Sequence, residues 1–201
     1  MKIKIIFSFF IALVLGSCSL FQTEQKQDVQ VEFLPGMMIT LPQPAQLGMD
    51  MQVSQIVSAA YHDKDGKVSN FSTQVEIVVK PDDMTMVALS GWGGSLFKLN
   101  YDGEAIQSSS LPMPNQNIGV KQSLTEFIIS NAPADVVRQM FAGTGIQLIV
   151  NKDGRVLEDK DGNKVMTIEY KGDKPWTGNI LIHNYHYDYT VKVQNLSFKT
   201  N

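Results

Sequence analysis

The chain has 201 residues, a length that favours a single domain of ordinary size. Hydrophobic residues make up 43% of it, enough for a buried core, which excludes a chain that is disordered throughout. The 17 basic and 20 acidic residues give a net charge of −3, which argues against nucleic acid as a partner. A single cysteine excludes a disulfide framework and a multi-cysteine metal site.

Residues 1–17 have the pattern of a bacterial export signal. Lys2 and Lys4 form a charged start, and residues 5–15 form an apolar run that only Ser8 interrupts. A permanent membrane-spanning helix needs roughly 20 apolar residues, so this run is too short to be one. We therefore expect residues 1–17 to be a cleaved signal peptide.

The signal ends in Leu15-Gly16-Ser17-Cys18, which resembles the lipobox of bacterial lipoproteins. The resemblance implies cleavage before Cys18 and lipid attachment to its thiol, with acyl chains that anchor the protein to a membrane. Ser19, not aspartate, follows the cysteine, which implies the periplasmic face of the outer membrane. The alternative is an ordinary secretory signal beside a buried cysteine.

The rest of the chain divides into a tether and one domain. Residues 18–30 are mostly polar and are predicted to form a flexible, lipid-anchored tether. Residues 31–201 contain no repeat of solenoid length and no second linker, so we expect them to form a single domain.

The first half of this domain has the pattern of successive strands. Residues 49–61 alternate between apolar and polar side chains, which is typical of a strand with one buried face and one solvated face. Similar segments follow at 71–80, 84–90 and 97–101, separated by turn residues such as Asp65-Gly66. Short turns between successive strands predict an antiparallel meander.

Two short helices are predicted in the middle of the chain. Ser123 with Glu126 three residues later fits a capping box, followed by an apolar stripe of Leu124, Phe127 and Ile128. Pro133 is predicted to be the first residue of a second helix that ends near Gly143, with an apolar stripe of Val136, Val137, Met140 and Phe141. Both stripes are expected to pack against other apolar side chains of the protein.

Strands return after the helices, at residues 146–150, 155–158, 165–171, 179–184 and 187–196. The sequence therefore predicts a mainly β protein of the α+β class, in which a single curled antiparallel sheet is interrupted by helices.

Motifs for catalysis and for metal binding are absent from the sequence. It has no G-x-S-x-G, H-E-x-x-H or phosphate-loop motif, and nothing places a serine beside a base. Residues 159–163 are similar to the start of a calcium loop, but an EF-hand needs glutamate at the twelfth position, which here is Tyr170. A hairpin turn explains this segment. His183 and His186 would point to opposite faces of an extended strand, as rim residues rather than ligands. We expect no catalytic residue, no metal and no cofactor, and therefore no enzyme.

Several segments resemble known lipoprotein families. Leu89-Ser90-Gly91, residues 97–103 and Leu111-Pro112 resemble an uncharacterised lipoprotein family of Gram-negative bacteria, often encoded beside aryl-polyene synthesis genes. An exported lipoprotein of this size, with sheet, helices and sheet in that order, also looks like LolB and its soluble relative LolA. These resemblances imply a LolA/LolB-like incomplete barrel, whose concave side holds acyl chains under a short helical lid.

Two functions follow as expectations. The first is a monomeric outer-membrane carrier or acceptor that holds a lipid, a lipoprotein acyl chain or a polyene-type product, received from a periplasmic donor protein. The second is an interaction module that helps to assemble a cell-envelope machine, with its sheet filled by its own side chains. For the first, the candidate cavity residues are Val53, Val75, Ile77, Met86 and Leu99 of the sheet, with Leu124, Phe127, Ile128, Val137, Met140 and Phe141 of the helices.

Overall fold

The computed structural model describes residues 29–63, 65–91, 93–111, 119–172 and 178–200. The predicted signal peptide and residues 18–28 of the predicted tether, which include Cys18, lie outside these ranges. The last two tether residues belong to the fold, because the carbonyl oxygen of Val29 accepts a hydrogen bond from the Leu41 N–H at 2.8 Å and Gln30 begins a strand. Within the described ranges, no helix has both the length and the hydropathy to cross a membrane.

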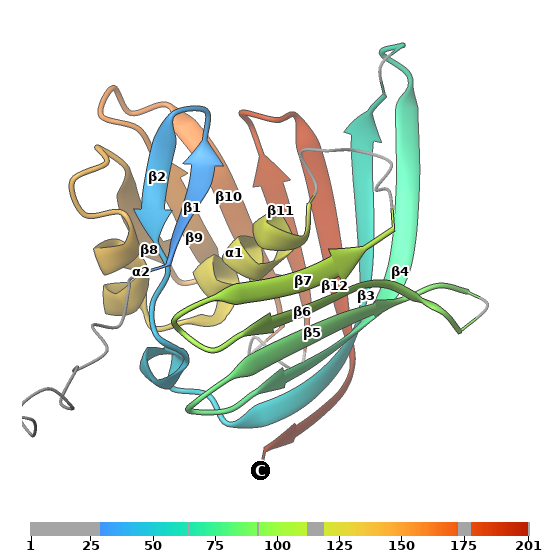
Figure 1. The fold of residues 1–201 in the computed structure, drawn as a ribbon. Coiled ribbons are helices and arrows are strands. Elements are labelled where there is room, and N and C mark those ends of the chain that lie inside the picture. Colours follow the sequence, from blue (N-terminus) through green and yellow to red (C-terminus); the bar gives the residue numbers. More distant parts are fainter. Residues whose placement is uncertain (1–28, 64, 92, 112–118, 173–177, 201) are drawn as a thin grey trace, which may run out of the picture.

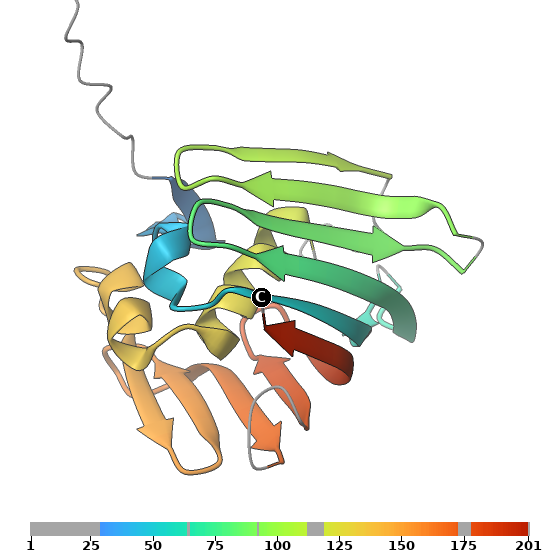
Figure 2. The same ribbon diagram turned by 90° about the horizontal axis from the view of Figure 1, so that it is seen from below.

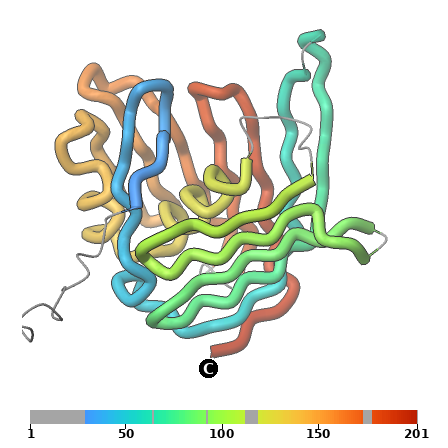
Figure 3. Tube along the Cα trace, in the orientation of Figure 1, coloured from blue at the N-terminus to red at the C-terminus, as the bar shows by residue number. Residues whose placement is uncertain are grey.

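Ten antiparallel strands form one sheet in the order β7-β6-β5-β4-β3-β12-β11-β10-β9-β8 (Figure 1). Five precede the helices in the chain: β3 (Met51–His62), β4 (Val68–Val79), β5 (Met84–Leu89), β6 (Ser95–Tyr101) and β7 (Ile106–Ser110). Five follow them: β8 (Gln147–Asn151), β9 (Gly154–Glu158), β10 (Lys164–Lys171), β11 (Asn179–Asn184) and β12 (Tyr189–Thr200). Each group is a meander, and the two groups, which we call the β3–β7 wing and the β8–β12 wing, join where β3 pairs with β12 (Figure 3).

The sheet curls around a helix without closing. Figures 1 and 2 show the two wings bending toward the same side, with helix α1 (Val120–Asn131) in the hollow between them. The outermost strands β7 and β8 do not pair with each other in the described part of the chain. The predicted fold class, a curled antiparallel sheet with two short helices, is confirmed.

The helices begin at residues other than those predicted. Gly119 is the N-cap of α1, and the Ser123 hydroxyl donates to the Gly119 carbonyl oxygen at 3.1 Å. The predicted capping box of Ser123 and Glu126 is therefore wrong, because both residues lie inside a helix that starts three residues earlier. Helix α2 (Ala134–Met140) has Pro133 as its N-cap and not as its first residue.

A two-stranded hairpin that the sequence did not reveal packs beside the end of helix α2. It consists of β1 (Gln30–Leu34) and β2 (Met37–Thr40) and is followed by a short 3₁₀ helix, η1 (Pro44–Leu47). The Phe33 ring packs edge-on against Phe141, with 4.9 Å between the ring centroids. The Tyr101 hydroxyl of β6 donates to the Pro42 carbonyl oxygen at 3.0 Å. The hairpin thus covers part of the apolar stripe predicted for the second helix.

The segment similar to a calcium loop is a hairpin turn, as predicted. One carboxylate oxygen of Asp159 accepts hydrogen bonds from the backbone N–H groups of Asp161 and Asn163, each at 2.9 Å. Gly162 has φ +81°, a conformation that suits glycine in the turn between β9 and β10. Among the described residues, no group of His, Cys, Asp or Glu side chains is arranged to hold a metal ion.

The two histidines lie in different elements. His183 is in β11, with its ring 4.2 Å from that of Tyr185, while His186 is exposed in the turn before β12. The expectation of opposite strand faces does not apply, because β11 ends at Asn184 and His186 lies outside the strand.

Candidate ligand-binding pocket

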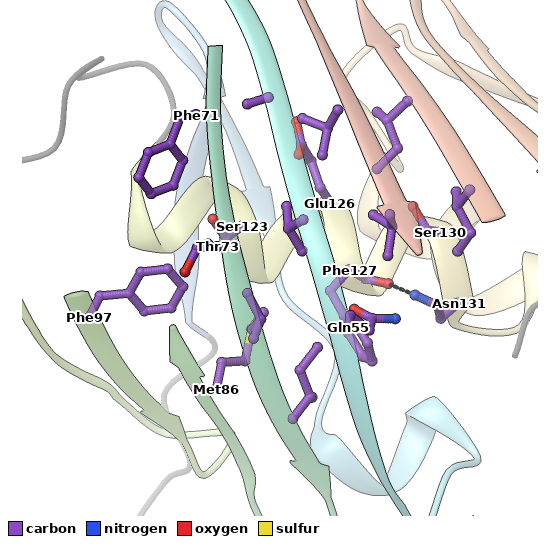
Figure 4. A pocket seen from close by; sticks show the side chains of 18 residues that line it. Gln55, Phe71, Thr73, Met86, Phe97, Ser123, Glu126, Phe127, Ser130 and Asn131 are labelled. Atoms are coloured by element: carbon purple, nitrogen blue, oxygen red, sulfur yellow. Dashed lines mark hydrogen bonds between the residues drawn. The ribbon is translucent and has the colours of Figure 1, made fainter. Parts of the chain in front are cut away.

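A pocket with a volume of about 80 Å³ lies between α1 and the inner face of the sheet (Figure 4). Its floor comes from six strands: Gln55, Val57 and Ala59 of β3, Phe71, Thr73, Val75 and Ile77 of β4, Met86 of β5, Phe97 of β6, Ile180 and Ile182 of β11, and Val191 and Val193 of β12. Its other side is a face of α1 that we call the roof: Ser123, Glu126, Phe127, Ser130 and Asn131.

The floor is apolar because strand alternation sends every second side chain to the inner face. In β3 and β4, Ala59 lies opposite Phe71 and Val57 lies opposite Thr73, so that side chains form rows across the sheet. The two polar side chains of the floor have partners outside the pocket. Gln55 donates to the Asn195 side chain at 2.7 Å, and Thr73 donates to the Leu89 carbonyl oxygen at 2.6 Å. The floor therefore offers mainly hydrocarbon to a ligand.

The roof, in contrast, is mostly polar. Its residues are spaced by three, four and seven positions, which places them on one side of the helix. Four of the five are polar, and Phe127 alone is apolar. Leu124 and Ile128, the rest of the stripe predicted for this helix, are fully buried but do not line the pocket.

Glu126 is the buried acid of the roof, with 6% of its surface exposed. Its Oε1 atom accepts hydrogen bonds from the Tyr189 hydroxyl of β12 and from the Gln122 amide, the latter at 3.2 Å. Burial raises the pKa of the Glu126 carboxyl from 4.5 to about 7, although both hydrogen bonds favour the charged form. The carboxyl therefore changes its charge near neutral pH.

Side-chain hydrogen bonds tie α1 to the β8–β12 wing. In addition to Tyr189, the Tyr170 hydroxyl of β10 donates to the Ser130 carbonyl oxygen, and Arg155 of β9 donates to the Ile129 carbonyl oxygen, each at 2.6 Å. Carbonyl groups in the last turn of a helix lack intrahelical partners, so strand side chains supply donors here. The C-terminal half of α1 is thereby fixed to one wing of the sheet.

Two buried atoms of the roof have no hydrogen-bond partner among the described residues. They are the Ser130 hydroxyl oxygen and the Asn131 side-chain oxygen. The Asn131 amide nitrogen donates to the Phe127 carbonyl oxygen at 2.8 Å, which assigns the other end of the amide as the unpaired acceptor. A buried polar group without a partner costs about 1–3 kcal/mol, so each atom would gain from a ligand or water that pairs with it.

The family of the chain follows from a match over most of its length. A sequence profile described as "Protein of unknown function (DUF3261)" matches residues 52–197, from β3 into β12. The chain belongs to this family. No curated protein matches it.

Solved structures with a similar fold come from bacteria. A LolA superfamily protein of Nitrosomonas europaea is 10% identical, with a TM-score of 0.43 over 76% of this chain and 86% of that one. A domain assigned as an outer membrane lipoprotein-sorting protein of Vibrio parahaemolyticus is 7% identical, with a TM-score of 0.40 over 78% and 88% of the two chains. The gene neighbourhood expected from the sequence resemblance stays a prediction.

The residues predicted to line a cavity divide into two groups. Four of them line the pocket: Val75, Ile77, Met86 and Phe127. Seven are buried in the core without lining it: Val53, Leu99, Leu124, Ile128, Val137, Met140 and Phe141. Glu126 was interpreted as a cap, and Ser130 and Asn131 were not predicted at all. Their regular spacing on one face of α1 was the signal that could have identified them.

The lining has no cationic side chain. None of its 18 residues is lysine, arginine or histidine, and its one titratable group is the Glu126 carboxyl. The pocket can therefore remove a hydrocarbon group from water, but it has no charge to neutralise an anion.

Proposed function

We propose that the protein carries or accepts a hydrophobic cargo by taking an acyl-type chain between α1 and the inner face of the sheet. The observation that carries this proposal is the apolar floor under a helix that Arg155, Tyr170 and Tyr189 tie by hydrogen bonds to the β8–β12 wing. Ligand pockets are typically apolar with a few placed polar groups, and this lining has that composition.

The pocket is too small to hold a whole acyl chain without a change in the position of α1. A cavity of about 80 Å³ is smaller than the engineered cavity of about 150 Å³ that admits benzene. A chain of ten or more carbons therefore needs α1 to move away from the β3–β7 wing. Burying roughly 400 Å² of chain would gain about 10 kcal/mol at about 25 cal/mol per Å². The cost of association is of similar size, which makes binding weak and reversible, as a carrier requires.

The place of action rests on the N-terminal sequence. Lipid attachment at Cys18 would hold the domain at the periplasmic face of the outer membrane, where a periplasmic donor protein could deliver the cargo. A lipid, a lipoprotein acyl chain and a polyene-type product all have the apolar chain that the floor fits. The protein would act as a monomer, without a cofactor and without catalysing a reaction.

Two neighbouring alanines provide the test. Ala59 lines the pocket, whereas the side chain of Ala60 points to the opposite face of the same strand. Ala59→Met should fill the pocket and weaken binding of the uncharged fluorescent probe N-phenyl-1-naphthylamine at least fivefold, while the control Ala60→Met should bind as the wild type does. Thermal unfolding of both variants checks the fold. The proposal is wrong if the wild type does not bind the probe, or if Ala59→Met binds it equally well.

One observation favours the alternative function, an interaction module for an envelope machine. Most of the inner face is packed with the protein's own side chains, including the fully buried Val53 and Leu99. On this alternative, the small pocket is a packing defect, and the wild-type protein binds no apolar probe. The same titration therefore distinguishes the two functions.

A further inference from the structure

We infer that the pocket selects a cargo whose acyl chain carries an uncharged head group with hydrogen-bond donors and acceptors, such as a glycerol ester, over a fatty-acid anion. This inference rests on the proposed function and adds the chemical class of the ligand. It is carried by the two unpaired roof atoms together with the charge of the lining.

The unpaired atoms define what the head group must supply. A serine hydroxyl can donate and accept, whereas an amide oxygen can only accept. Ser130 and Asn131 both lie in the last turn of α1, and both line the pocket. Ser130, which is one of the lining residues, is 2% exposed, and its hydroxyl has no partner among the described residues. A ligand hydroxyl or N–H can donate to Asn131, whereas a carboxylate has no proton to donate.

The rest of the roof disfavours an anion. Glu126 lies one helical turn before Ser130 on the same face, and no lysine, arginine or histidine lines the pocket. A buried charge without a counter-ion is strongly unfavourable, and an ionised carboxyl at Glu126 would repel a second negative charge. A carboxylate or phosphate head would thus lose its hydration without gaining a cation.

The floor provides a separate place for the chain. Figure 4 shows Ser130 and Asn131 at one side of the pocket and the rings of Phe71 and Phe97 at the other. A head group at the end of α1 therefore leaves the rows of apolar floor side chains free for hydrocarbon.

Competition for the probe tests the selectivity. In this assay, monodecanoylglycerol or decanoate is titrated at pH 8 into the wild-type protein with bound N-phenyl-1-naphthylamine. The two competitors have the same ten-carbon acyl chain and differ in the head group. We expect the glycerol ester to displace the probe at a concentration about tenfold lower, a difference that corresponds to one or two hydrogen bonds. Equal or stronger displacement by decanoate would overturn the inference. This comparison needs no variant.

A serine-to-alanine pair locates the effect. Ser130→Ala should weaken binding of monodecanoylglycerol about fivefold more than it weakens binding of the probe, because the glycerol ester loses one net hydrogen bond. Ser109→Ala, on the exposed strand β7, is the matched control and should behave as the wild type. If Ser130→Ala does not change the affinity for the glycerol ester, water and not a ligand pairs with the hydroxyl, and the inference is wrong. If neither the probe nor either lipid binds the wild type, the proposed function itself fails.

Discussion

The buried carboxyl of Glu126 predicts an unusual dependence of stability on pH. Burial raises the pKa of this group from 4.5 to about 7, so the folded protein holds the proton more tightly than the unfolded chain. Between these two pH values the folded state binds more protons, and the free energy of unfolding must fall as the pH rises. A shift of this size corresponds to about 3 kcal/mol, a large fraction of the 5–15 kcal/mol typical of a domain.

Glu126→Gln isolates this contribution. Glutamine stays neutral at every pH, and its side-chain oxygen can still accept hydrogen bonds from Tyr189 and Gln122. We expect the variant and the wild type to be about equally stable near pH 4.5. At pH 8 the variant should be more stable by up to about 3 kcal/mol. Most of the difference should develop between pH 5 and 7.

Urea unfolding followed by far-ultraviolet circular dichroism, at several values between pH 4.5 and 8.5, measures this difference. Asp82→Asn, in the exposed segment between β4 and β5, is the matched control, because it also replaces one carboxyl by an amide, and it should keep the pH dependence of the wild-type stability. The exposed carboxyls of Asp63 and Asp159 have lowered pKa values because turn hydrogen bonds favour their charged forms, so their contributions are lost only at lower pH. A wild-type stability that does not decrease toward pH 8, or an equal slope in Glu126→Gln, would refute the reasoning.

Three further predictions concern two aromatic residues and the lipid anchor. Phe141→Ala should lower the free energy of unfolding by about 3–5 kcal/mol without changing probe binding by the folded protein, since this ring packs on Phe33 outside the pocket. Phe127→Ala should instead enlarge the pocket and change probe affinity; equal binding in both variants would contradict the assignment of Phe127 to the lining. Cys18→Ala should abolish lipid attachment, detected by mass spectrometry, and release the protein from membranes, while the melting temperature of the protein stays unchanged; a variant that still fractionates with membranes would disprove the lipobox interpretation.

The strands were predictable wherever the alternation of side chains reflects a sheet with one buried face. The strand predicted at residues 49–61 differs from β3 (Met51–His62) by only one or two residues at each end. The prediction worked because the inner side chains of this strand are apolar, with Gln55 as the exception. The strand β7 lacks this signal. Its sequence ends in three serines, all exposed, and its strand conformation depends on pairing with β6. A strand that is stabilised mainly by backbone pairing with a neighbouring strand need not show alternating apolar and polar side chains.

The long-range pairing of the sheet could not be predicted in the same way. Local turns specify each meander, but the contact between β3 and β12 joins residues about 130 positions apart, as in Ala59 opposite Val191. Both strands have apolar inner faces, and so do several others. Alternation shows which face is buried but not which strand lies beside it.

The pocket was missed in part because the prediction treated α1 as a surface helix with a single buried face. In the curled sheet, residues 124–130 are all buried, so the helix has a polar side and an apolar side that are both removed from solvent. The polar side is tolerated because Tyr189 and Tyr170, distant in sequence, provide hydrogen bonds. No local pattern reveals such partners.

The way α1 is held indicates how a chain longer than the pocket could enter. Directional hydrogen bonds from Arg155, Tyr170 and Tyr189 fix it to the β8–β12 wing. Across the pocket, the lining contributed by β4, β5 and β6 is mainly apolar, and apolar contacts can be exchanged for contacts with a ligand at little cost. In the proposed binding mode, a chain inserted between α1 and these strands would contact the apolar floor on one side and the mostly polar roof on the other, without breaking the hydrogen bonds to the β8–β12 wing.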